Sequence, residues 1–182
     1  MYMYCLFCQT QKCGQIATTI EQLLSIRVIN PKIIQRYWKK GKEELREHNY
    51  MPGYLFLYAD EPIESFKDVN RISGVIRRLG TSDTGYDLRG VDRDFAQMLL
   101  NLNGTIGVMK TYQEGDTVKL ASFLYQGFSG EIKRLDRKKG RAQIEFEFDG
   151  STQSVWVGYE NIEMIEDVEA KEEVKAEALR NA

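Results

Sequence analysis

The chain has 182 residues, of which 42% are hydrophobic and 29% are charged, and its net charge is −2. This length accommodates one medium domain or two small ones, and the composition predicts an ordinary globular protein. No apolar run is long enough for a membrane span, and the N-terminus lacks the basic region of a signal peptide, so we predict a cytoplasmic protein with no membrane contact. The near-neutral charge excludes nucleic-acid binding through bulk charge and leaves only a local basic patch to support it.

The first half of the chain alternates predicted strands with predicted helices. Residues 2–9 are rich in Tyr and Phe and predict a buried strand, and the spacing of apolar residues from Ile16 to Leu24 predicts an amphipathic helix. An extended segment with a charged turn at 39–42 follows, and then strands at 52–58 and 74–79 and helices at 62–72 and 92–102. We therefore predict an α+β domain over residues 1–102, in which a sheet is flanked by helices.

The strand at 52–58 carries an unusual amount of aromatic surface. Because side chains alternate along a strand, Tyr54, Phe56 and Tyr58 share one face, and Leu55 and Leu57 share the other. Helices can cover one of these faces. The aromatic face then either belongs to the core as well or stays uncovered as a surface for a partner.

The second half of the chain predicts strands alone. Residues 103–113 contain two glycines and few core candidates, and we predict that they form a linker. Five short apolar segments follow within residues 114–165, and Asp149-Gly150 is a strong hairpin signal between two of them. These features predict a small all-β barrel, followed by an acidic tail at 166–182 that frays or stays disordered.

Basic residues crowd around one predicted hairpin turn in the second half. One acidic residue, Asp136, lies among them. The basic residues of the cluster are Lys133, Arg134, Arg137, Lys138, Lys139 and Arg141. One interpretation is a solvated turn that happens to be basic. The other is a positively charged finger that contacts phosphates, either in a groove of folded RNA or in a major groove widened by a bulge.

No pattern indicates catalysis, a metal site or a cofactor. The sequence lacks the common nucleophile, zinc and phosphate-loop motifs, and its single histidine, His48, follows Glu47 on a polar stretch. Cys5, Cys8 and Cys13 do not complete a four-ligand zinc site, and a strand over 2–9 would point Cys5 and Cys8 to opposite faces. We therefore predict a binding protein with reduced, buried cysteines rather than an enzyme.

These segments, in this order, resemble a known family. MYCLFCQTQKCGQIATTI, VINP, KKGKEELREHNYMPGYLFLY and GVIRRLG resemble the N-terminal domain of the NusG transcription factors. EGDTVKL and GFSGEIKRLDRKKGRAQIEFEF resemble the KOW domain that follows it, which is an SH3-like barrel. The resemblance covers about residues 2–165.

The resemblance implies a transcription elongation factor that acts as a monomer without a cofactor. In this family the N-terminal domain docks on the clamp helices of RNA polymerase through an aromatic-lined pocket. The positions that match this pocket are Tyr4, Met51, Tyr54 and Phe56. On this basis the aromatic face would be an uncovered polymerase-binding surface, and an anchor of this kind contributes about 2 kcal/mol or more.

Departures from the family pattern concern both domains. Met3 replaces a Trp, Cys13 replaces a Glu, and Met51 replaces a Phe. In the KOW domain, Phe123-Leu124 replaces Gly-Pro, and Asp149-Gly150-Ser151 replaces a Phe-Gly-Arg step whose Phe contacts ribosomal protein S10 and Rho. Asp149 would have to lose its hydration to take the place of the Phe side chain in these contacts, so we expect weaker binding to both partners.

With its docking tip lost and its basic turn enriched, the sequence is most similar to the LoaP-type antiterminators. This resemblance implies that it binds a hairpin in a leader RNA and promotes read-through of terminators. An RfaH-like factor recruited by nontemplate DNA and a general NusG-type elongation factor are the alternatives within the family. From other classes, a ribosomal or RNA-structural adaptor and a metal or redox protein built on the three cysteines remain as competing hypotheses.

Overall fold

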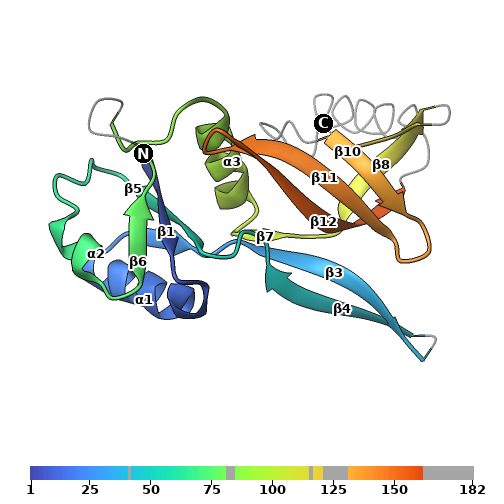
Figure 1. The fold of residues 1–182 in the computed structure, drawn as a ribbon, viewed down its shortest axis with the longest axis horizontal. Helices are drawn as coiled ribbons and strands as arrows, with labels where there is room; N and C mark the ends of the chain where they lie inside the picture. Colours follow the sequence, from blue (N-terminus) through green and yellow to red (C-terminus); the bar gives the residue numbers. More distant parts are fainter. Residues whose placement is uncertain (41, 81–84, 115–116, 121–130, 162–182) are drawn as a thin grey trace, which may run out of the picture.

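The computed structural model of the chain describes residues 1–40, 42–80, 85–114, 117–120 and 131–161 (Figure 1). A mixed α/β region is followed by a β-rich region, as the predicted fold class requires. The elements of the first region are β1 Tyr2–Cys8, η1 Thr10–Lys12, α1 Cys13–Leu24, β2 Arg27–Ile29, β3 Lys32–Lys39, β4 Lys42–Asn49, β5 Tyr54–Ala59, α2 Lys67–Arg71, β6 Val75–Arg78 and α3 Gly90–Asn101. Those of the second are β7 Thr105–Ile106, β8 Met109–Glu114, β9 Thr117–Leu120, β10 Glu131–Asp136, β11 Arg141–Phe148 and β12 Ser151–Asn161.

The N-terminal sheet has the strand order β2-β5-β1-β6, and all its neighbouring strands are antiparallel. One face packs against α1 and α2, where Ile16, Ile20 and Val69 are buried. The other face packs against α3 through Phe95 and Met98. The aromatic strand β5 lies inside the sheet and is therefore sandwiched between two apolar layers.

A tight turn leads the chain into β5. The backbone N–H of Tyr54 donates to the carbonyl of Met51 at 3.1 Å, and Gly53 has a φ of 95°. Pro52 and Gly53 thus occupy the positions that a type II turn requires of them. A Cβ at position 53 would lie 2.8 Å from the Phe7 ring, so the close approach of β1 also demands glycine.

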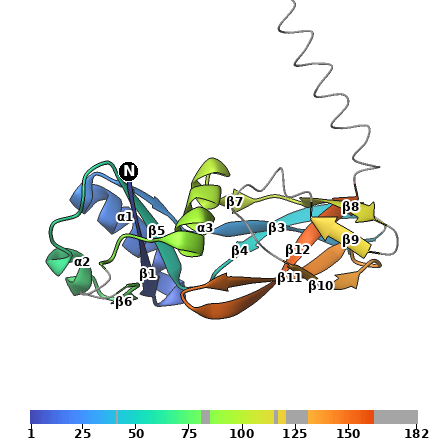
Figure 2. The same cartoon turned by 90° about the horizontal axis from the view of Figure 1, so that it is seen from above.

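A long hairpin extends from the N-terminal region alongside the β-rich region (Figures 1 and 2). It consists of β3 and β4, and β7 adds to β3 in parallel to complete a three-stranded sheet. Both β7 and the start of β8 fall in the segment 103–113, for which we predicted no strands. The segment connects the two regions as paired strands, and its Ile106 and Met109 are fully buried.

The C-terminal sheet has the strand order β10-β11-β12-β8-β9, with β12 and β8 parallel. Its outer strands, β9 and β10, also lie against each other, so the sheet curls toward a barrel. Asp149 and Gly150 connect β11 to β12 with φ values of 54° and 65°. Positive φ at both central residues is the geometry of a type I′ hairpin turn, which the Asp-Gly pair predicted.

One predicted helix differs from the structure, and three further features of the sequence lie outside the described residues. The helix predicted over 62–72 is limited to Lys67–Arg71, because Pro62 and Ile63 stay in an irregular segment. The strand predicted from Ile162 to Ile165, the acidic tail at 166–182 and the Phe123-Leu124 departure lie outside the described residues. Among the described residues, no helix is both long and apolar enough to cross a membrane.

Candidate functional site

The residues predicted to bind polymerase divide between the two faces of the N-terminal sheet. Met51, Tyr54 and Phe56 lie on the face that carries α3, where Met51 and Phe56 are buried and Tyr54 is half-buried. Tyr4 is buried on the opposite face, and its hydroxyl accepts a hydrogen bond from the backbone N–H of Ile63 at 3.1 Å. The structure therefore brings three of the four residues together and places the fourth elsewhere.

The hairpin β11–β12 covers the aromatic face. Phe148, at the end of β11, is fully buried, with its ring centroid 5.6 Å from that of Tyr54 and 5.5 Å from that of Phe56. Phe146 stacks on Phe95 of α3 at 5.2 Å. Our expectation of an uncovered face is therefore wrong in this arrangement, because the chain's own barrel supplies the apolar cover that period-two alternation could not reveal.

Tyr50 takes part in this packing at a cost. Its ring lies almost parallel to that of Phe146, with a centroid distance of 5.9 Å, and the residue is only 4% exposed. Burial raises the pKa of Tyr50. Within the described part of the chain its hydroxyl finds no hydrogen-bond partner, and an unsatisfied buried group of this kind costs about 1–3 kcal/mol.

Polar contacts fasten the tip of the β11–β12 hairpin to the N-terminal region. Arg77 donates from Nη2 to Asp149 Oδ2 at 2.5 Å, and the backbone N–H of Asp149 donates to Asp92 Oδ1 at 3.0 Å. The hydrogen bond with Asp149 raises the pKa of Arg77, and burial raises the pKa of Asp92. The residue that replaces the Phe of the NusG pattern thus binds the chain's own N-terminal region.

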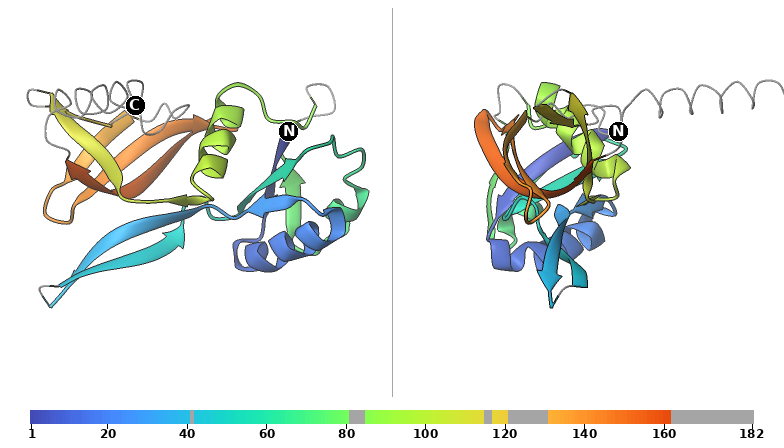
Figure 3. Two further views of the ribbon diagram at one scale, coloured as in Figure 1. Left: turned by 180° about the vertical axis from the view of Figure 1, so that it is seen from behind. Right: turned by 90° about the vertical axis from the view of Figure 1, so that its right-hand side faces the viewer.

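A second contact joins the β3–β4 hairpin to β12, and the two lie side by side in Figure 3. Arg36 Nη2 donates to Glu160 Oε2 at 2.9 Å, and Gln35 Nε2 donates to the carbonyl of Trp156 at 2.8 Å. The barrel is therefore held at two places, its hairpin tip and the edge formed by β12.

The basic cluster lies at the opposite end of β11 from the docked tip, around the turn 137–140. Two of its members form exposed ion pairs. Lys133 Nζ lies 2.6 Å from Glu131 Oε2, and Lys139 Nζ lies 3.8 Å from Asp136 Oδ2. Such exposed pairs contribute little and open readily for a phosphate.

The remaining members of the cluster are available to a ligand to different degrees. Arg141 is half-buried, and its guanidinium lies 5.5 Å from the centroid of the Tyr37 ring. Arg134, Arg137 and Lys138 are exposed, and none of them lies within ion-pair distance of a carboxylate in the described segments. The structure therefore gathers the predicted residues into one surface with three unpaired charges.

Sequence reasoning missed an aromatic residue beside this surface. Trp156 of β12 is 36% exposed and lines a hollow of about 640 Å³ together with Arg134, Arg137 and Lys138. Alternation along β12 places Val155 and Val157 toward the interior and Trp156 outward, and that signal was present in the sequence.

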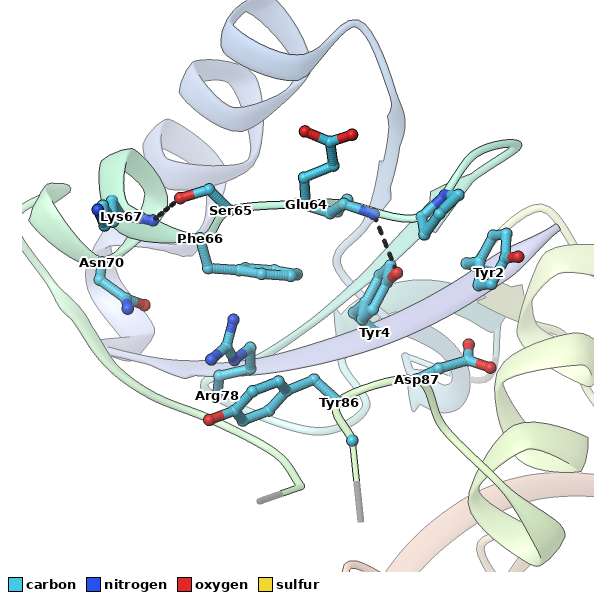
Figure 4. Close-up of a pocket in the computed structure, with 13 residues that line it drawn as sticks. Tyr2, Tyr4, Glu64, Ser65, Phe66, Lys67, Asn70, Arg78, Tyr86 and Asp87 are labelled. Atoms are coloured by element: carbon cyan, nitrogen blue, oxygen red, sulfur yellow. Dashed lines mark hydrogen bonds between the residues drawn. The ribbon is translucent and has the colours of Figure 1, made fainter. Parts of the chain in front are cut away.

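A pocket of about 460 Å³ on the other face of the N-terminal sheet also escaped prediction (Figure 4). Tyr4 and Tyr2 line one end of it. At the other end Arg78 lies between two rings, with its guanidinium carbon 4.2 Å from the centroid of Phe66 and 3.1 Å from that of Tyr86. The pocket thus combines aromatic faces with a cation, a combination that suits a flat anionic or π-rich ligand.

The cysteines and the histidine contribute no reactive site in the described residues. Cys5 belongs to the core on the α3 face, and Cys8 and Cys13 belong to the core against α1. Burial raises the pKa of Cys5 and Cys13 and raises the pKa of Cys8 to about 12, so the thiols stay protonated at neutral pH. His48 is exposed on β4, 3.0 Å from the Tyr37 hydroxyl.

Comparison with known proteins gives consistent matches. A family model described as "Transcription termination factor nusG" matches residues 1–99. The "Transcription termination/antitermination protein NusG" of Borreliella burgdorferi is 24% identical over 136 residues, which cover 70% of this chain and 74% of that protein. The protein of the same name from Campylobacter jejuni is 23% identical over 145 residues and covers 80% of this chain and 81% of that protein.

A solved structure described as "Domain interaction in Thermotoga maritima NusG" covers 86% of this chain and 93% of its own. The TM-score is 0.52 at 14% sequence identity, so this likeness concerns the fold. The family match spans more than half of the sequence, and the fold agrees with it over most of the chain. The chain belongs to the NusG family, whose members are transcription termination and antitermination factors rather than enzymes.

Proposed function

We propose that this chain is a LoaP-type antitermination factor that acts in the cytoplasm. It binds the clamp helices of RNA polymerase through its N-terminal sheet and a leader RNA hairpin through its KOW domain, and it promotes read-through of terminators in a target operon. The observation that carries this proposal is the layout of β11, which ends in a docked aromatic tip on one side and an uncovered basic turn on the other.

The RNA site rests on the unpaired charges of the turn. Arg134, Arg137 and Lys138 point into solvent without carboxylate partners in the described segments, and Lys133 and Lys139 hold only exposed ones. Each phosphate contact releases condensed counterions, so the affinity would fall steeply as salt rises. A narrow two-strand turn also fits an RNA groove that is widened beside an unpaired nucleotide.

The polymerase site rests on the apolar face around Met51, Tyr54 and Phe56. Membership in the NusG family implies interaction with RNA polymerase, and an apolar, aromatic face is the kind of surface that anchors a partner helix. In the closed arrangement Phe148 occupies this face. Polymerase and the hairpin tip would therefore compete for the same residues, and binding requires the tip to leave.

The separation of the two sites allows them to act in sequence. β11 has eight residues and so spans about 25 Å between the docked tip and the basic turn. RNA can therefore bind the turn while the tip still covers the polymerase site. A leader hairpin that emerges from polymerase would then hold the factor close to the enzyme at a high local concentration. The contact between the apolar face and polymerase could therefore form even if it is weak by itself.

Single-round transcription with the host polymerase tests this function. One template carries the native leader upstream of an intrinsic terminator, and the other carries a scrambled leader of the same length. We expect read-through that requires both the protein and the native leader. Read-through that ignores the leader, or an effect on pausing alone, would contradict targeted antitermination and indicate a general elongation factor.

Charge-reversal variants link this result to the basic turn. The double substitution Arg137→Glu and Lys138→Glu is expected to abolish leader-dependent read-through and hairpin binding. The matched control is the double substitution Arg27→Glu and Arg71→Glu, which reverses two exposed cations on β2 and α2 outside the turn and outside the pocket of Figure 4. Equal loss in the control would mean that net charge, rather than the turn, controls the activity.

The pocket around Arg78 supports a second candidate, recruitment by nontemplate DNA. An unpaired base could lie against the exposed ring of Tyr2, while Arg78, held between Phe66 and Tyr86, contacts its phosphate. Templates that alter the nontemplate strand without altering the transcript separate the two candidates. Read-through that follows the DNA strand and is lost in Arg78→Ala would favour this candidate over the leader RNA.

A further inference from the structure

A row of side chains crosses the outer face of the C-terminal sheet next to the basic turn. Arg134 on β10 is the register partner of Gln143 on β11, and Gln143 is the partner of Trp156 on β12. Directly opposed residues on neighbouring strands project to the same side of a sheet. The row therefore places a guanidinium, an amide and an indole side by side on a surface exposed to solvent.

The strands beneath this row are held in place from both sides. Gln143 Nε2 donates to Ser154 Oγ at 2.7 Å, which links β11 to β12 next to the indole. The carbonyl of Trp156 accepts a hydrogen bond from Gln35 of the β3–β4 hairpin at 2.8 Å. The backbone that carries the indole is thus fixed, yet the side chain remains 36% exposed although tryptophan is mostly buried in folded proteins.

Cations surround the exposed ring on the side of the turn. The hollow beside Trp156 has a volume of about 640 Å³. An apolar ring with unpaired cations around it matches a nucleotide, whose base has a π-face and whose phosphates flank it. The hollow is lined by Arg134, Leu135, Asp136, Arg137, Lys138 and Trp156.

The charge pattern of the same face limits where a nucleic-acid backbone can run. Beyond the row, away from the turn, the outward positions of β10 and β11 carry three carboxylates, Glu131, Glu145 and Glu147, against one cation, Lys133, which pairs with Glu131 at 2.6 Å. These carboxylates repel phosphates. The nucleic acid is therefore confined to the half of the sheet that contains the turn and Trp156.

We propose that this hollow binds one unpaired RNA base, preferably a purine, stacked on the indole of Trp156. Arg134, Arg137 and Lys138 contact the phosphates on either side of it. This inference rests on the proposed function and deepens it, because it adds recognition of a flipped or bulged base to contacts with a duplex backbone. Bases inside a helix present only their edges, so the site distinguishes an interrupted stem from a continuous one.

Two RNA hairpins with the same stem test the proposal, one with a single unpaired adenine beside the stem and one fully paired. The wild-type chain is expected to bind the first about tenfold or more tightly, in the range measured for stacking on an aromatic side chain. Trp156→Ala should bind both hairpins equally, and Trp156→Phe should retain part of the preference. Thermal unfolding of each variant confirms that it is folded.

Fluorescence reports on the stack directly. The sequence contains two tryptophans, so Trp38→Phe leaves Trp156 as the only indole. Its emission should be quenched by the hairpin with the unpaired adenine and far less by the paired hairpin. Quenching of equal size by a DNA hairpin of the same sequence would overturn the assignment to RNA.

The outcomes separate this proposal from the function on which it rests. If the wild-type chain binds both RNA hairpins with equal, salt-dependent affinity, the base site is wrong and binding through the basic turn stands. If it binds neither hairpin, both the base site and the proposed RNA function are overturned.

Discussion

The two ends of β11 have opposite environments although the strand is only eight residues long. At one end Phe146 and Phe148 are buried against the N-terminal sheet and α3. At the other end Arg137 and Lys138 face solvent, without an ion-pair partner in the described segments. A single strand thus presents its apolar end to its own chain and its basic end to solvent.

The chemistry of the side chains accounts for this difference between the two ends. Aromatic side chains gain stability wherever they find an apolar face, and the nearest such face is the one that the NusG pattern assigns to polymerase. Lysine and arginine keep their hydration unless an anion replaces it. The tip therefore docks on the N-terminal sheet, and the turn stays exposed to solvent.

Removing the aromatic tip should disturb this arrangement most. Phe148→Ala deletes the ring between Tyr54 and Phe56, and truncation of a buried Phe costs about 3–5 kcal/mol. The barrel should undock, which small-angle scattering would detect as a larger radius of gyration. Affinity for polymerase should rise, because the competing side chain is gone.

The exposed neighbour of this residue provides the control for undocking. Glu147→Ala removes an outward side chain of β11 whose Oε1 accepts a hydrogen bond from Thr152 Oγ1 at 2.6 Å, and it should leave the radius of gyration unchanged. Unchanged scattering in Phe148→Ala would contradict the view that this ring holds the barrel closed.

Neutralising the basic end should leave docking intact and weaken RNA binding. In Arg137→Gln with Lys138→Gln, two phosphate contacts are lost. The slope of log affinity against log salt should decrease by about 1.5–2, and the affinity at low salt should fall about tenfold or more. Fluorescence anisotropy with the native leader hairpin measures both. A slope that does not change would exclude these side chains from contact with phosphate.

Tyr50 packs against Phe146, so a substitution there affects the docked end of β11 and not the basic end. Its hydroxyl is buried without a partner in the described structure, so Tyr50→Phe should stabilise the chain by about 1 kcal/mol in a denaturant titration. Loss of stability of that size in Tyr50→Phe would show that the hydroxyl has a partner.

The same residue predicts a pH dependence. Burial raises the pKa of Tyr50 above that of an exposed tyrosine, which is near 10. Ionisation of Tyr50 therefore takes nothing from the stability of the docked, folded form below about pH 10. The stability of the docked, folded form falls as the pH rises further, because the Tyr50 hydroxyl ionises more easily in the undocked or unfolded form. Measurement of stability against pH should show this loss in the wild type and a smaller loss in Tyr50→Phe.

The ion pair at the tip should have the smallest effect. Arg77 is 49% exposed at its side chain, so solvent screens its contact with Asp149, and Asp149→Asn should weaken docking by about 0.5–1 kcal/mol. A double-mutant cycle with Arg77→Gln measures the coupling between the two residues. Coupling near zero would assign the docking to the aromatic rings alone.

Much of the molecule follows from local patterns in the sequence. The alternating aromatic residues of β5, the helical spacing from Ile16 to Leu24 and the Asp149-Gly150 turn each predicted the observed element, because periodicity and turn chemistry are local properties. The basic turn was also visible, since adjacent residues of a hairpin must share a surface. The order of the segments along the chain was enough to suggest the NusG family.

Only the tertiary structure decided which surfaces are available. Alternation places Phe56 on a face but does not show that Phe148, far away in sequence, covers it. Likewise, the register of β1 against β5 is needed to show that Tyr4 and Phe56 lie on opposite faces of the sheet. Trp156 lies beside Arg134 because three strands are in register. Burial and neighbourhood depend on contacts between distant segments, and a local pattern carries no information about them.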